Sequence, residues 1–131
     1  MLKNTGYRSL IVYEKAFVLA MIYKMTEKYP KTETYSLVDQ IRRSSRGVCS
    51  CIAEAYRKRQ YPAYFSNKCA DADAEKSETM VWLEFSLACQ YINDDEFEKS
   101  VLAAEEVGRI LNTMVEHTEK FLPKGTNPKT K

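Results

Sequence analysis

The chain has 131 residues and a formal net charge of +2, with 44% hydrophobic and 29% charged residues. This length suits a single domain that buries a core without help from disulfides or a structural metal. The apolar run from Ala16 to Tyr23 is too short to span a membrane and the chain opens without a secretory leader, so we expect no membrane partner and a cytoplasmic location.

Long helices are predicted, because only four Gly and four Pro occur and the prolines fall where helical periodicity stops. The first helix is expected over residues 9–29, capped by Ser9 and ended by Pro30. Its apolar residues cover more than one face, so we expect it to be buried on most sides.

The second helix is expected over residues 35–59, with a core face opposite a line of basic side chains. Small residues along it permit close approach by another backbone; they are Ser44, Ser45, Gly47, Ser50, Ala53 and Ala55. The basic stripe, as we call it, runs along this helix and is extended by one lysine of the next. It comprises Arg42, Arg43, Arg46, Arg57, Lys58, Arg59 and Lys68.

The third helix is expected over residues 62–92, with Pro62 in its first turn. It carries two apolar stripes, of which a four-helix core needs only one. The second stripe comprises Ala70, Ala74, Val81, Phe85, Ala88 and Ile92. An acidic stripe that we expect to face solvent comprises Asp71, Glu75 and Glu78.

The fourth helix is expected over residues 94–121, capped by Asn93 with Glu96 as its reciprocal partner. Residues 123–131 lack periodicity and are predicted to form a flexible basic tail. The whole pattern predicts an all-α, antiparallel up-and-down four-helix bundle in one domain, residues 1–122. Its excess apolar surface on the first and third helices predicts a homo-oligomer.

No arrangement of residues predicts catalysis, a cofactor or a metal. Metal-binding bundles use Glu-x-x-His pairs, whereas the only histidine, His117, follows Met114 at that spacing. His117 also lacks a nucleophile constellation, and no glycine-rich nucleotide motif occurs. The four cysteines form no CxxC pair and are interpreted as buried, reduced thiols; they are Cys49, Cys51, Cys69 and Cys89. We therefore predict a protein that is not an enzyme.

The basic stripe has two interpretations. It offers phosphate groups donors over a span of roughly 25 Å, at about 1.5 Å per residue, and could follow a nucleic-acid backbone. Alternatively, carboxylates neutralise it: Asp39 is placed to pair with Arg43, and Glu54 lies one turn from Arg57. The acidic stripe of a neighbouring subunit could do the same, which would make the chain a protein-interaction or assembly scaffold.

The string SLVDQIRRSS at residues 36–45, followed by Ile-Ala-Glu-Ala at residues 52–55, resembles the signature of four-helix bundle proteins encoded by intervening sequences within bacterial 23S ribosomal RNA genes. The resemblance extends over residues 7–122. It places Arg42, Arg43 and Arg57 at basic positions of the family motif. Where that family reads Ser-Ile-Pro-Ser-Asn-Ile-Ala-Glu-Gly, this chain has GVCSCIAEA at residues 47–55, and the lost Pro and Gly should straighten and extend the second helix.

That family is similar in fold to the accessory variability proteins of diversity-generating retroelements. Those proteins form pentameric barrels and bind nucleic acid and a reverse transcriptase. The resemblance therefore implies a homo-pentamer, an RNA or DNA partner, and a protein partner such as a reverse transcriptase.

Overall fold

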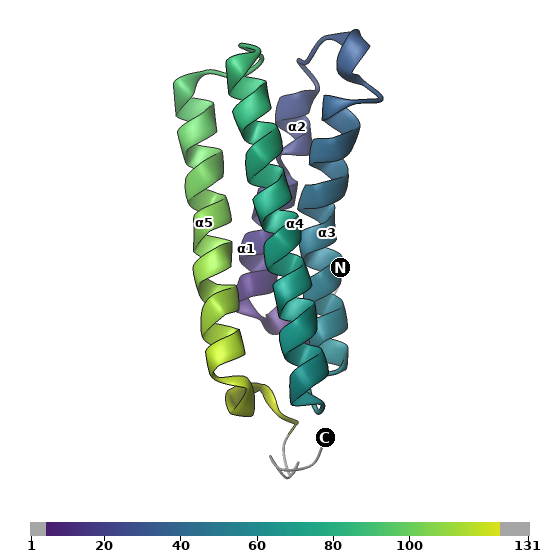
Figure 1. Ribbon diagram of the computed structural model, residues 1–131, viewed down its shortest axis with the longest axis vertical. Coiled ribbons are helices and arrows are strands. Elements are labelled where there is room, and N and C mark those ends of the chain that lie inside the picture. The colour runs from purple at the N-terminus through teal and green to yellow at the C-terminus, as the bar shows by residue number, and fades with distance from the viewer. Residues whose placement is uncertain (1–4, 124–131) are drawn as a thin grey trace.

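Residues 5–123 of the chain are described by a computed structural model, and their regular elements are all helical. Four columns of helix form one domain, and the first column is made of two short helices (Figure 1). The elements are η1 (Gly6–Ser9), α1 (Ile11–Ala20), α2 (Tyr23–Thr26), η2 (Lys31–Glu33), α3 (Leu37–Arg57), α4 (Pro62–Ala88), α5 (Asp94–Glu116) and η3 (Thr118–Phe121). The predicted all-α, four-helix, single-domain fold is confirmed for this part of the chain.

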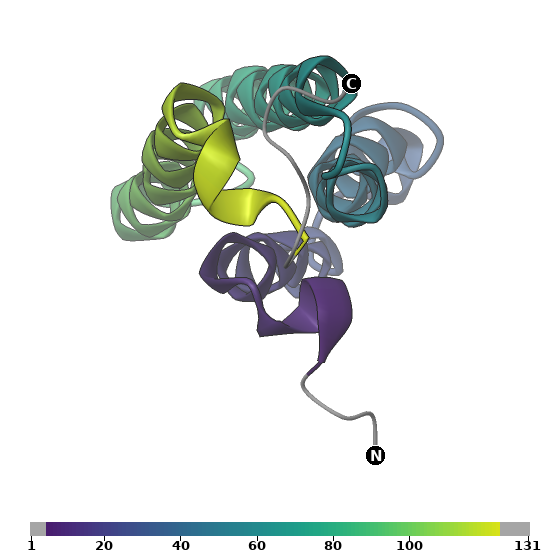
Figure 2. The same ribbon diagram turned by 90° about the horizontal axis from the view of Figure 1, so that it is seen from below.

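The columns surround a common centre, with α1 between α3 and α5 and across from α4 (Figure 2). The α3–α4 connection lies at the lower end of the molecule in Figure 1, and the α4–α5 connection lies at the upper end. The turn η3 folds beneath the lower end, where Phe121 stacks on Phe65 with their ring centroids 5.5 Å apart. Of the predicted tail at residues 123–131, all but Pro123 lies outside the described residues.

The first helix differs from the prediction of one helix over residues 9–29. It breaks after Ala20, where the Met21 and Ile22 N–H groups bond three residues back, to Val18 and Leu19, and tighten the turn. Ser9 does not cap it, because the Ser9 hydroxyl donates to the Gly6 carbonyl within η1, at 2.7 Å.

The prediction that the first helix is buried on most sides is wrong. Ile11, Phe17 and Val18 of α1 are 67%, 52% and 63% exposed in the isolated chain. The reason is that α1 packs mainly against α3, α5 and η1, which leaves one flank of the helix exposed in the single chain. An apolar face on an outer column thus remains open to a partner.

The helix α3 runs unbroken from Leu37 to Arg57, as the absence of the family proline predicted. Its small residues let α4 pack closely: Ser44 and Ser45 are buried, and the Thr79 hydroxyl of α4 donates to the Ser44 hydroxyl at 2.8 Å. Buried polar groups need such partners, since an unpaired hydroxyl in the core is destabilising. This contact fixes α3 against α4 and thereby orients the outer face of α3.

The helix α4 begins at Pro62 as predicted but ends at Ala88, four residues before the expected Ile92. Gln90 adopts a left-handed backbone, with φ of 62°, and the Tyr91 N–H bonds to the Ser86 carbonyl at 3.0 Å. This is the helix ending that usually has glycine at the left-handed position. Because Gln stands there, the sequence carried no stop signal.

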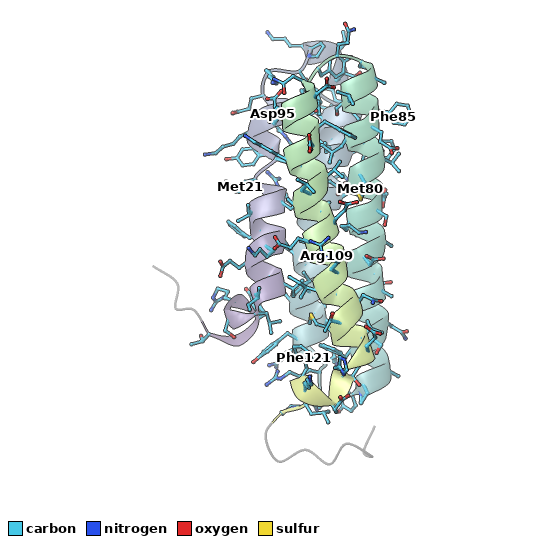
Figure 3. All side chains as sticks on the ribbon, turned by 90° about the vertical axis from the view of Figure 1, so that its left-hand side faces the viewer. Met21, Met80, Phe85, Asp95, Arg109 and Phe121 are labelled. Atoms are coloured by element: carbon cyan, nitrogen blue, oxygen red, sulfur yellow. The ribbon has the colours of Figure 1, made fainter. Side chains whose placement is uncertain are left out.

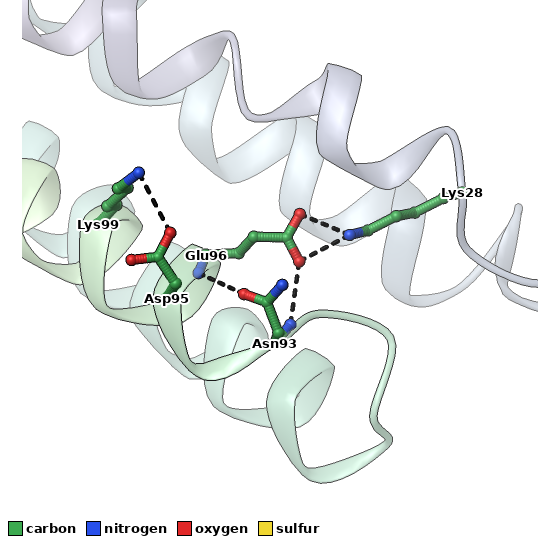
Figure 4. A network of polar contacts seen from close by, with 5 residues as sticks. All are labelled: Lys28, Asn93, Asp95, Glu96 and Lys99. Atoms are coloured by element: carbon green, nitrogen blue, oxygen red, sulfur yellow. Dashed lines mark hydrogen bonds and ion pairs between the residues drawn. The ribbon is translucent and has the colours of Figure 1, made fainter.

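The start of α5 is fixed by the capping box that the sequence predicted (Figure 4). The Asn93 side chain accepts the Glu96 N–H at 2.8 Å, and the Glu96 carboxylate accepts the Asn93 N–H at 3.0 Å. Lys28 also donates to the Glu96 carboxylate at 2.6 Å, and with the Asn93 N–H it lowers the pKa of Glu96. A residue preceding η2 is thus tied to the beginning of α5.

Replacing Asn93 with Ala is expected to lower the free energy of unfolding by about 1 kcal/mol, because the first turn of α5 loses the acceptor for an otherwise unpaired N–H. Chemical denaturation measures the change. Asn112→Ala, on the exposed side of α5, is the matched control and should be close to neutral. Equal losses from both substitutions would contradict a capping role.

Candidate nucleic-acid interface

The basic stripe divides into two groups on α3. Arg42, Arg43 and Arg46 lie in the first half of α3, whereas Arg57, Lys58 and Arg59 lie where α3 ends. Arg46 and Arg57 are 11 residues apart, which is about three helical turns and roughly 16 Å, so they share a side of α3. Four of these six side chains are exposed, and Arg42 and Arg59 are half-buried.

Two of the arginines cover Tyr23, on the short helix α2. The guanidinium carbons of Arg42 and Arg46 lie 5.8 and 5.5 Å from the centre of the Tyr23 ring. Arg42 Nε also donates to the Thr26 hydroxyl at 3.0 Å. These contacts hold α2 against α3 and orient the guanidinium groups. The helical periodicity of residues 35–59 could not predict these contacts with Tyr23 and Thr26, because both residues come from a separate element.

At the lower end of α3 the basic side chains lie among tyrosines. The Arg59 guanidinium stacks over the Tyr56 ring at 3.9 Å, and its Nη1 donates to the Tyr56 carbonyl. Lys58 Nζ lies 5.9 Å from the Tyr61 ring centre and 5.6 Å from that of Tyr64. A surface depression is lined by Arg57, Lys58, Arg59, Gln60, Tyr61 and Pro123. The cations here were predicted from the sequence, whereas the role of the rings was not.

Carboxylates neutralise little of the basic stripe. Among residues 5–123, its only ion-paired member is Lys68, which lies 3.3 Å from Glu54 and 3.6 Å from Asp71. The Glu54 carboxylate pairs with Lys68 rather than with Arg57, and Asp39 forms no ion pair with Arg43 within this range. The hydrogen bond from Lys68 to Glu54 raises the pKa of Lys68. Lys68 is therefore the member least available to a ligand.

The acidic stripe of α4 borders α3 at Gly47, where Glu75 lies. Glu75 is half-buried rather than solvent-facing as predicted, because its carboxylate lies over Gly47, where an added Cβ would meet it. Burial and the neighbouring Glu78 raise the pKa of Glu75, and Arg43 opposes that shift. Arg43 therefore borders the acidic stripe, whereas Arg42 and Arg46 contact α2.

The cysteines are partly as expected. Cys69 is buried, Cys49 and Cys51 are half-buried, and burial raises the pKa of Cys49 and Cys69 to about 11, which keeps both as thiols. The prediction that all four are buried is wrong for Cys89, which is exposed because α4 ends there.

Across residues 5–123 no group of three or more His, Cys, Asp or Glu side chains is placed to hold a metal ion. Within the same range, no helix is long and apolar enough to cross a membrane.

Comparison with known proteins identifies a family and related solved structures. A family model described as "23S rRNA-intervening sequence protein" matches residues 8–113. A crystal structure of a protein of unknown function from the S23 ribosomal protein family, from Bacteroides thetaiotaomicron, is 26% identical, with a TM-score of 0.71. The match covers 81% of this chain and 99% of that one. The search of curated proteins gave no match.

Proposed function

The chain belongs to the family of 23S rRNA-intervening sequence proteins, whose model spans residues 8–113, and from this premise we propose a cytoplasmic, non-catalytic bundle protein that binds the backbone of RNA or DNA through the basic stripe. One observation carries the proposal. The six members of the stripe from Arg42 to Arg59 form no ion pair with any carboxylate in residues 5–123. Positive charge that the protein leaves unneutralised along one flank attracts a polyanion.

The geometry suits phosphate contacts. Contact with Tyr23 restrains Arg42 and Arg46, which reduces the conformational entropy that binding would remove. The Thr26 bond uses Nε of Arg42, so its two Nη groups remain to donate to phosphate oxygens. Such contacts position a nucleic acid without reading its sequence.

Filter binding of a structured RNA, and of a DNA hairpin, over a series of salt concentrations tests the proposal. Binding should weaken with salt, and a logarithmic slope of about −5 corresponds to five or six phosphate contacts. Absence of binding to both probes at about 50 mM salt would overturn it.

We propose further that the antiparallel, up-and-down bundle assembles into a homo-oligomer, a pentamer by family resemblance. The support lies in apolar residues that one chain leaves open. Val81 and Phe85 of α4 are 42% and 55% exposed, and Phe85 points outward from the bundle (Figure 3). Beside them is a groove lined in part by Leu37, Trp82 and Cys89.

The double variant Val81→Glu, Phe85→Glu is expected to convert the assembly to monomers, because it would bury two carboxylates without partners in the subunit interface. Light scattering coupled to size-exclusion chromatography reads the mass. Tyr35→Glu, at a residue that is 94% exposed near the upper end, serves as the control and should leave the mass unchanged. A wild-type protein of monomeric mass at micromolar concentration would contradict the assembly.

A second candidate is a scaffold without a nucleic-acid role. Its support is the exposed acidic flank of α4, since Asp71 and Glu78 of one copy could pair with the basic stripe of another copy. In the same way, the basic stripe could dock on an acidic partner protein. In that case the Arg42→Glu, Arg46→Glu variant would lose assembly or partner binding, and wild-type protein would not retain RNA or DNA on a filter. A reverse transcriptase is the partner that family resemblance suggests for the first trial.

A further inference from the structure

The turn between α3 and α4 brings cations and aromatic rings together on the surface. We call its six residues the basic–aromatic turn: Tyr56, Arg57, Lys58, Arg59, Tyr61 and Tyr64. The Tyr61 N–H bonds to the Lys58 carbonyl at 2.9 Å, and Pro62 begins α4 at once. This tight connection holds residues of two helices side by side at one end of the bundle.

The rings of the turn remain accessible although Lys58 lies near them. Tyr61 and Tyr64 are 40% and 44% exposed; Tyr61 immediately precedes α4 and Tyr64 lies in its first turn, and the Lys58 ammonium group lies near both rings. One Lys58 ammonium group is shared by the two rings, at 5.9 and 5.6 Å from their centres, so it contacts at most one face of each. Internal cation–π contacts alone would explain the position of Lys58 but leave two open aromatic faces beside three positive charges.

The middle of α3 is different. There two guanidinium groups, those of Arg42 and Arg46, lie over one half-buried ring, that of Tyr23, so that part of the basic stripe presents charge without an exposed ring. It suits phosphates alone. The basic–aromatic turn presents charge together with open ring faces, which suits phosphates and bases.

We propose that the basic–aromatic turn binds unpaired nucleotides, with bases stacked on Tyr61 and Tyr64 and their phosphates held by Arg57 and Lys58. This inference rests on the proposed nucleic-acid binding and specifies its ligand at one end of the stripe. Bases within a duplex are already stacked on each other and cannot reach a protein ring, whereas loops, bulges and single strands can. The stacked Arg59 guanidinium and Tyr56 form a further flat platform next to them.

Fluorescence anisotropy of the full chain with two labelled probes tests this inference. One probe is a 12-nucleotide single strand, prepared as RNA and as DNA, and the other is a blunt duplex of the same strand length. The variant Tyr61→Ala, Tyr64→Ala is expected to bind the single strand roughly ten- to a hundredfold more weakly, the loss typical of one to two stacked bases. Its affinity for the duplex should change less than about twofold, and its salt dependence should stay the same, because no phosphate contact is lost.

Three controls keep the result interpretable. The variant Tyr61→Phe, Tyr64→Phe retains the rings and should bind like wild type. Tyr35→Ala removes an exposed tyrosine elsewhere and should leave the affinity unchanged. Circular dichroism shows whether each variant is folded. If wild-type protein binds but the alanine variant loses less than about threefold on the single strand, or loses equally on both probes, the inference is overturned while the proposed function stands. If wild-type protein binds neither probe, the proposed function itself has failed.

Discussion

Reversing the charge at Arg46 and Arg57 together, as Arg46→Glu with Arg57→Glu, is expected to weaken RNA or DNA binding by roughly a hundredfold or more at low salt. A hydrogen bond to a charged group contributes about 1.5 kcal/mol or more, which is roughly tenfold in affinity for each of the two sites. The two side chains are exposed and lie about three turns apart on one side of α3. Filter binding over a salt series should show a slope reduced by about 1.8, for two lost phosphate contacts.

The control carries the same change of net charge on another part of the surface. Lys15→Glu with Lys99→Glu alters α1 and α5, where the two lysines pair with Glu106 and Asp95. It should weaken binding by less than about threefold, since exposed charges more than a Debye length away are screened. Equal losses from both double variants would mean that net charge, and not the basic stripe, determines binding.

Replacing Phe65 with Ala is expected to lower the free energy of unfolding by about 3–5 kcal/mol, a large share of the roughly 5–15 kcal/mol typical of a domain. Phe65 is 1% exposed and stacks on Phe121, which fastens η3 beneath the core. Truncation leaves a cavity at the lower end and removes that contact. Urea unfolding at fixed protein concentration measures the change.

Phe85→Ala is the matched comparison, because Phe85 is 55% exposed in the single chain. This substitution should lower the free energy of unfolding by less than about 1 kcal/mol in dilute solution. A larger loss that grows with protein concentration would locate Phe85 in an interface, since association stabilises only the folded chains that associate. Similar losses for Phe65 and Phe85 in dilute protein would contradict the burial described above.

Much of the fold could be predicted from local signals. Pro62 set the start of α4, and Asn93 with Glu96 set the start of α5, because each residue satisfies or removes a specific backbone donor. Helix ends were predicted less well. The left-handed residue after α4 is Gln90 where glycine is usual, and the break after Ala20 has neither Gly nor Pro. Both depend on tertiary packing that a single helix does not encode.

The candidate site was predicted in part for the same reason. Helical periodicity placed Arg42, Arg46 and Arg57 away from the core, since that requires only the geometry of one helix. Whether each is paired depends on other elements: Tyr23 lies under two of them, and Glu54 reaches across to Lys68. The open tyrosines of the α3–α4 turn could have been noticed from their spacing beside three cations.

Gly47 determines where the Glu75 carboxylate lies. A glycine inside a helix is about 1 kcal/mol less favourable than alanine, and an alanine methyl at position 47 would meet only the end of the flexible Glu75 side chain. Gly47→Ala is therefore expected to displace that carboxylate and to leave the α3–α4 contact in place. The glycine thus lets an acidic group lie close against α3, beside the outer face that is proposed to bind phosphates.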